Sequence, residues 1–131
     1  GNWTYRIAVN CRLGDMENDD LALLDTGAEW SVISDDIAEP IRDQIGPCTE
    51  SFSISTRFGE ISGDLHRIQI TLLSEQGYGQ DLVIEGSVFI SKEWLGPPII
   101  LGYRGFLEKI RIAIDPGVTP NEERFFFGEP G

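Results

Sequence analysis

The chain has 131 residues, of which 40% are hydrophobic and 24% are charged, so it is long enough to bury roughly two-thirds of the surface that its unfolded form exposes. No apolar run approaches the roughly 20 residues of a membrane span, and a formal net charge of -12 repels nucleic-acid phosphates and anionic lipid surfaces. We therefore expect one soluble globular domain over residues 1–131, with no membrane span and no nucleic-acid partner.

The residue types that bind metals or act as nucleophiles are sparse. Cys11 and Cys48 lie far apart and lack the spacing of a zinc site, so we predict free, buried thiols, no metal and no cofactor. His66 is the single histidine, and no Ser/His/Asp triad or Cys/His dyad is evident around it. We expect it to be a surface or half-buried strand residue. Because the sequence begins at Gly1 and not at Met, we expect a piece of a longer chain. The sequence therefore does not predict the cellular compartment of the protein.

Alternation of apolar and polar residues predicts strands in the first part of the chain. Residues 3–9 alternate, so that one face of a half-buried strand carries Trp3, Tyr5, Ile7 and Val9. After a polar turn at residues 14–20, short apolar strands at 21–24 and 31–34 enclose a tight Asp-Thr-Gly turn. Asp35 is expected to cap a brief helix through Ile37 and Ala38 that Pro40 ends.

The remaining pattern continues as short strands. Phe52 and Ile54 alternate with serines, and an alternating strand at residues 68–72 follows a glycine-bracketed tip, which predicts a long hairpin. Further strands are expected at residues 82–84, 88–90, 99–101, 110–114 and 124–127, with one short helix at residues 103–109 that turns Phe106 and Leu107 inward. Many short strands with little helix indicate a mainly β, small closed-barrel-like domain.

Two segments carry the functional signal. In the first, Leu23 and Leu24 lead a lone carboxylate, Asp25, into a Thr-Gly turn; in the second, a Pro-Ile-Ile-Leu-Gly run at residues 98–102 leads into the predicted short helix. The pair resembles the retropepsin-like aspartic proteases, in which the active-site loop follows an apolar strand and a hydrophobic-hydrophobic-Gly segment packs across it. The Gly-Tyr-Arg sequence at residues 102–104 resembles cellular and bacterial members more than viral ones.

The resemblance implies an acid-protease fold and a homodimer in which each subunit supplies Asp25 as the catalytic carboxylate. Thr26 would hydrogen-bond across the dimer, Gly27 would let the substrate backbone approach, and residues 57–64 would form a flap. The residues implied to contact an extended peptide are Ala28, Glu29, Phe58, Gly59, Ile61, Ile99 and Ile100, with Val32 as a further wall. A dimer-forming sheet would use Phe125, Phe126, Phe127 and the strand that contains Trp3.

The resemblance also implies a supporting role for Gly102 and Arg104. Viral members carry Asp where this chain has Glu29, and Arg directly after the glycine, where this chain has Tyr103. We therefore expect Arg104 to lie opposite Glu29.

The implied chemistry requires a pair of carboxyl groups. Amide hydrolysis needs one ionised group to accept a proton from water and one protonated group to donate a proton to the substrate, and two carboxylates about 3 Å apart share a single proton because their repulsion is strong. Because the motif occurs once, a second copy has to supply the partner. The sequence therefore predicts an aspartic endopeptidase that is active as a homodimer.

Simpler interpretations remain open at this stage. The Asp-Thr-Gly sequence is also common in ordinary turns, so Asp25 could be a turn residue without a catalytic role. Residues 58–63 could likewise be the tip of an ordinary hairpin and not a flap. A catalytically idle version of the same fold would act as a dimerisation or peptide-binding module. An unrelated acidic β domain that binds a protein partner is the third hypothesis.

Overall fold

The computed structural model describes residues 6–15, 19–56, 59–74 and 80–109, together with the backbone of residues 111–115 and 124–128. Trp3 and Tyr5 of the first predicted strand, and Phe58 of the predicted flap, lie outside the described residues. The fold is mainly β, as the alternating sequence pattern predicts.

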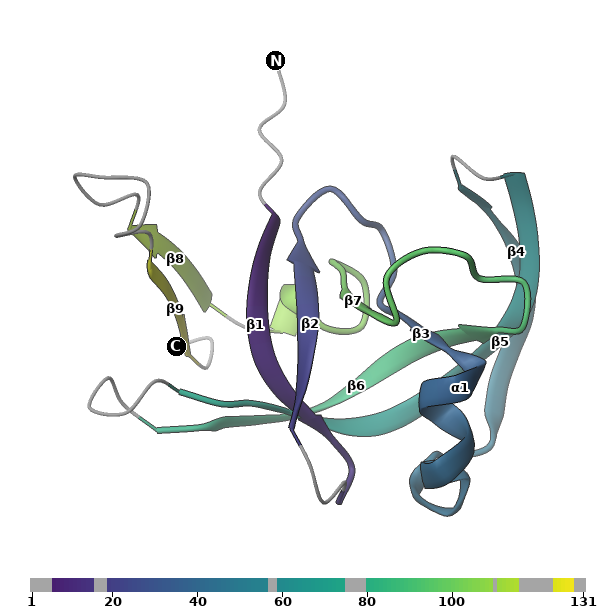
Figure 1. Cartoon of the computed structure of the whole chain (residues 1–131), viewed down its shortest axis with the longest axis horizontal. Coiled ribbons are helices and arrows are strands. Elements are labelled where there is room, and N and C mark those ends of the chain that lie inside the picture. The colour runs from purple at the N-terminus through teal and green to yellow at the C-terminus, as the bar shows by residue number, and fades with distance from the viewer. Residues whose placement is uncertain are drawn as a thin grey trace.

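One sheet curls round and closes on itself. Its strands run in the order β1-β2-β7-β3-β6-β5-β4, with the bounds β1 Arg6–Leu13, β2 Asp20–Asp25, β3 Val32–Ser34, β4 Cys48–Thr56, β5 Gly59–Leu72, β6 Leu82–Ser91 and β7 Ile99–Leu101. The end of β1 also pairs with the end of β5, which closes the ring and leaves β4 outside it, attached to β5 alone among the described residues. Figure 1 shows β1 and β2 side by side at the centre and β4 at the right.

The helical segments are short, and two predictions about them are wrong. α1, Asp35–Ala38, is capped by Ser34 and not by Asp35, because Ser34 has extended backbone and its hydroxyl accepts a hydrogen bond from the Ile37 amide. α1 ends before Pro40, which lies in the following 3-10 helix η1, Glu39–Gln44. The helix predicted at residues 103–109 is only the 3-10 turn η2, Leu107–Lys109, because Gly105 adopts a left-handed φ of 78° that interrupts any longer helix.

Apolar side chains of β1, β2, β3, β5, β6 and β7 form the main core. Alternation in β1 continues beyond the predicted strand, so that Cys11 and Leu13 are fully buried. The main core also contains Leu24, Ile33, Ile70, Leu72, Val88, Ile99, Leu101 and Phe106. A second cluster lies beside the hairpin of β4 and β5 and contains Val32, Ile61, Leu65 and Phe89. Phe106 and Leu107 point inward as predicted.

β6 is one continuous strand, although the sequence predicts two. The predicted break coincides with Gly86, a residue type that usually weakens strands. Here Gly86 is buried, and a Cβ atom at this position would lie 2.8 Å from the Gly105 carbonyl oxygen. The glycine thus allows a loop to pack closely on the strand and does not end it.

β8, Arg111–Asp115, and β9, Arg124–Gly128, form a separate two-stranded antiparallel sheet (Figure 1). Phe125, Phe126 and Phe127 therefore pair with β8 of the same chain. Their participation in a dimer-forming sheet stays a prediction.

The two cysteines differ in environment. Both are free, but only Cys11 is buried. The prediction that Cys48 is buried is wrong, because Cys48 begins β4 outside the closed ring. Burial raises the pKa of the Cys11 thiol from 9.0 to about 12, and the negative charges of Asp20 and Asp19 add to the rise. Because only the thiolate reacts with alkylating reagents, Cys11 is expected to be inert in the folded chain.

Alkylation kinetics near pH 8 test this assignment. In the native protein we expect Cys48 to react readily and Cys11 to react only after unfolding, so that a Cys48→Ser variant takes up label only in denaturant. The folded-state pKa of Cys11 is raised, so its contribution to stability is intact below pH 9.0 and is lost as the pH rises toward about 12. Equal native-state labelling rates of the two thiols would contradict the burial of Cys11.

Candidate active site

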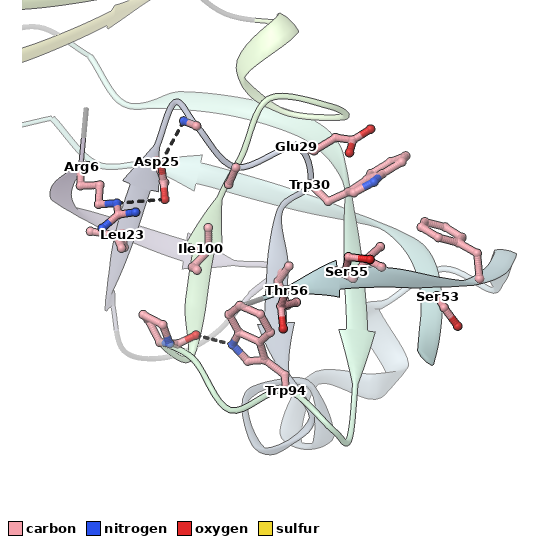
Figure 2. A pocket seen from close by; sticks show the side chains of 16 residues that line it. Arg6, Leu23, Asp25, Glu29, Trp30, Ser53, Ser55, Thr56, Trp94 and Ile100 are labelled. Carbon is pink, nitrogen blue, oxygen red and sulfur yellow. Dashed lines mark hydrogen bonds and ion pairs between the residues drawn. The ribbon is translucent and has the colours of Figure 1, made fainter. Parts of the chain in front are cut away.

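Asp25 is the last residue of β2 and opens the Asp-Thr-Gly turn. The residue is only 9% exposed. Its Oδ1 accepts a hydrogen bond from the Gly27 amide at 2.9 Å, and its carbonyl oxygen accepts one from the Ala28 amide at 3.1 Å. The turn therefore fixes the orientation of the carboxylate and directs Oδ2 away from the backbone (Figure 2).

Arg6 provides the second partner of the Asp25 carboxylate. The antiparallel register of β1 and β2 places Arg6 directly opposite Asp25, and the Arg6 Nε lies 3.3 Å from Oδ2. Sequence analysis missed Arg6, because the register between two strands joined by a long polar loop cannot be read from alternation alone.

The segment that contains β7 holds the Asp25 turn from the other side. Ile100 pairs with Leu23 of β2 and with Val32 of β3, so β7 lies between these strands, and the predicted packing across the Asp25 loop is present. After β7, the Gly102 amide donates to the buried Ser31 hydroxyl at 2.9 Å. A Cβ atom on Gly102 would lie 2.3 Å from the Trp30 carbonyl oxygen, so this approach requires glycine.

The predicted contact between Arg104 and Glu29 is also present. The Arg104 amide donates to the Glu29 carbonyl oxygen at 2.7 Å, and the Arg104 Nε lies 3.2 Å from Glu29 Oε1. The guanidinium also lies over the Trp30 ring, 5.5 Å from its centroid. Both charged side chains are exposed, so the backbone hydrogen bond and the ring contact contribute more to this loop than the ion pair does.

A cleft of about 780 Å³ opens beside Asp25 (Figure 2). Its lining comes from the β1–β2 pair, the turn after β2, the β4 strand and the loop before β7. The lining residues are Arg6, Leu23, Asp25, Gly27, Ala28, Glu29, Trp30, Val32, Phe52, Ser53, Ile54, Ser55, Thr56, Trp94, Pro97 and Ile100. The charged members are Arg6, Asp25 and Glu29, and the walls are otherwise mostly apolar and aromatic.

Three of the predicted cleft residues do not line the cleft. Ile99 is 1% exposed and belongs to the main core, while its neighbour Ile100 lines the cleft. Adjacent residues of a strand point to opposite faces, so only one of the two can reach the cleft. Ile61 packs in the second cluster and does not line the cleft. Gly59, at the exposed start of β5, is not among the lining residues either.

Sequence analysis missed the aromatic part of the cleft. The Trp30 and Phe52 rings contact each other in a tilted arrangement with centroids 5.3 Å apart, and Trp94 is fixed by a hydrogen bond from its Nε1 to the Pro97 carbonyl oxygen at 2.7 Å. The alternation that places Phe52 and Ile54 on one face of β4 was the available signal for part of this wall. Nothing in the sequence indicates which face of the hairpin meets Asp25.

His66 is half-buried in β5, as predicted, and its Nδ1 lies 2.8 Å from the Gly46 carbonyl oxygen. Within the described ranges, no three His, Cys, Asp or Glu side chains come close enough to hold a metal ion. In the same part of the chain, no helix has the length and hydropathy that a membrane span needs.

Comparisons with known proteins match the fold and not the sequence. No protein-family model and no curated protein sequence matches the chain. Among solved structures, the chain resembles the protease of EIAV in complex with the inhibitor HBY-793, with a TM-score of 0.56 over 76% of this chain and 83% of that one. The two sequences are 20% identical, so the likeness shows the fold alone. The fold is therefore retropepsin-like.

The hydrogen bond between Ser31 and Gly102 can be tested by substitution. Ser31→Ala leaves the buried Gly102 amide without its partner, so we expect the free energy of unfolding to fall by about 1–3 kcal/mol. Ser53→Ala is the matched control, because Ser53 is exposed and its hydroxyl bonds to the exposed Ser62 hydroxyl; its effect should stay within about 0.5 kcal/mol. Urea unfolding of both variants measures the difference, and equal effects would show that Ser31 does not anchor the Gly102 segment.

Proposed function

We propose that the chain is one subunit of an aspartic endopeptidase in which two copies bring their Asp25 side chains together. The observation that carries the proposal is the position of Asp25. Its carboxylate is partly buried, is oriented by the Gly27 amide and lies at a cleft with apolar and aromatic walls. A retropepsin-like fold supports the proposal as an analogy between folds.

The reaction divides between the two carboxyl groups. The ionised Asp25 takes a proton from a water molecule, and the resulting nucleophile attacks the peptide carbonyl carbon. The protonated Asp25 of the second copy donates its proton to the carbonyl oxygen, which gives a gem-diol. The first Asp25 then passes the proton that it took from water to the leaving nitrogen as the C–N bond breaks, and the second Asp25 regains a proton from a gem-diol hydroxyl as the carboxylic acid product forms. A single carboxyl group cannot hold both protonation states at once, which is why the proposal requires a second copy.

The cleft suits an extended peptide. β4 pairs with β5 along one edge, and residues 52–56 line the cleft, so a substrate could add its main chain beside this hairpin. Apolar side chains would contact Val32, Ile54 and Ile100, and aromatic ones would contact Trp94. In this proposal, closure of the hairpin tip excludes bulk water from the reacting bond, and Thr26 connects the two copies beneath the carboxylates.

One observation favours the alternative of a catalytically idle module. The Arg6 guanidinium already pairs with Asp25 Oδ2 in the single chain, so both oxygens of this carboxylate have partners within their own subunit. An idle module would still dimerise and bind extended peptides in the same cleft.

Incubation with a peptide library between about pH 4 and pH 7 tests the protease proposal. We expect wild-type protein to cleave, and Asp25→Asn to reduce kcat/KM by at least about 100-fold, because the amide cannot exchange a proton with water. Asp36→Asn is the matched control, since it removes the same charge from an exposed position on α1; it should cleave like wild type.

Sedimentation of the same samples separates the alternatives. A dimer that cleaves and is silenced by Asp25→Asn supports the endopeptidase. A dimer that binds peptides without cutting them supports the idle module, and a stable monomer favours an unrelated binding domain. Unchanged cleavage by Asp25→Asn would exclude Asp25 as the catalytic group.

A further inference from the structure

The hairpin of β4 and β5 projects beyond the rest of the sheet. β5 pairs with β6 as far as Asp64, whereas its pairing with β4 continues to Gly59. In the described part of the chain, residues 59–63 of β5 therefore have β4 as their only neighbouring strand. Residues 52–56 of β4, in the same hairpin, line the cleft. The position of the hairpin thus sets the position of one cleft wall.

The base of this hairpin is packed tightly on β6. A Cβ atom on Gly63 would lie 2.5 Å from the Ile90 carbonyl oxygen and 2.7 Å from the Phe89 ring, so only glycine fits there. Gly63 pairs with Phe52 of β4, and the Phe52 ring contacts that of Phe89 with centroids 5.3 Å apart. Going outward along β5, Ser62 is the next residue after this packed base.

Two side chains take the place of β6 beside Ser62. In an antiparallel ladder, the N–H and C=O of one residue bond to the same residue of the neighbouring strand, but the pairing with β6 stops at Asp64. Instead, the Ser91 hydroxyl donates to the Ser62 carbonyl oxygen at 2.6 Å, and Glu93 Oε2 accepts from the Ser62 amide at 2.9 Å. Ser91 is buried, and its hydroxyl accepts from the Glu93 amide at 3.0 Å. These three hydrogen bonds close a single network at the end of β6.

The network continues into the opposite wall of the cleft. Glu93 is followed directly by Trp94, whose side chain lines the cleft. Figure 2 shows the hydrogen bond from the Trp94 Nε1 to the Pro97 carbonyl oxygen, at 2.7 Å. The Trp94 amide also donates to the Ser91 carbonyl oxygen at 3.4 Å. The loop between β6 and β7 therefore contacts the hairpin through Glu93 and the cleft through Trp94.

We propose that Glu93 is a positioning residue that anchors the hairpin of β4 and β5 to the loop that carries Trp94, and so fixes the separation of the two cleft walls. The proposal rests on the proposed function, because it assigns these walls to a peptide substrate. Glu93 is not among the residues that line the cleft, so it acts on a bound peptide through the walls. Loss of the anchor weakens peptide binding and leaves the proton transfers at Asp25 unchanged.

Hydrogen exchange tests the anchor without relying on activity. Glu93→Ala should speed exchange of the Ser62 amide by about 10-fold and of the Trp94 indole N–H by about 2- to 10-fold. Glu93→Gln keeps an acceptor oxygen and should restore most of the protection. Glu50→Ala is the matched control, because it removes the same side chain from an exposed position on β4; both rates should stay unchanged. An unchanged Ser62 rate in Glu93→Ala, or an indole that does not respond, would overturn the proposal.

Peptide cleavage tests the consequence for the cleft. Glu93→Ala should raise KM by about 2- to 10-fold and keep kcat within about twofold, because the walls bind substrate while Asp25 performs the reaction. Glu93→Gln should restore KM, and Glu50→Ala should match wild type. A fall in kcat without a change in KM would contradict the role of Glu93. Faster exchange at Ser62 and Trp94 in a Glu93→Ala protein whose parent cleaves nothing would support the anchor and reject the proposed protease function.

Discussion

The insertion of β7 between β2 and β3 is the constraint on which the candidate site depends. Ile100 pairs with both neighbouring strands, which fixes the end of β2 and therefore the position of Asp25. The chain then passes so close to the Asp25 turn that only glycine fits at position 102, and the buried Ser31 hydroxyl satisfies the Gly102 amide. Because strands are stiff and this contact is buried, the carboxylate is held by the core and not by a flexible loop.

Charge is the second organising feature of the site. An acidic chain places a carboxylate at the edge of an apolar cleft, where ionisation is costly unless a partner compensates it. Gly27 compensates through its backbone amide and Arg6 through its guanidinium.

Local patterns predicted much of the fold and only part of the site. Alternation placed Phe52 and Ile54 on one face of β4, and the Asp-Thr-Gly turn and the Gly102 segment were identified from their own residues. The prediction failed where distant segments meet. Two strands were predicted where β6 is continuous, and the close approach of Gly105 that makes room for Gly86 within this strand is not visible in the sequence. Ile99 was assigned to the cleft because an apolar run in a buried strand does not show which residue faces which side.

The sequence by itself determined that the chain is mainly β and that Asp25 sits in a tight turn after an apolar strand. These features follow from period-two alternation and from short motifs, which depend on residues close together in the chain. Only the tertiary structure decided that Arg6 covers Asp25 and that Trp94 joins the cleft wall. The first contact requires the register between β1 and β2, and the second requires the folding of the loop before β7 against the cleft. Neither can be read from alternation alone.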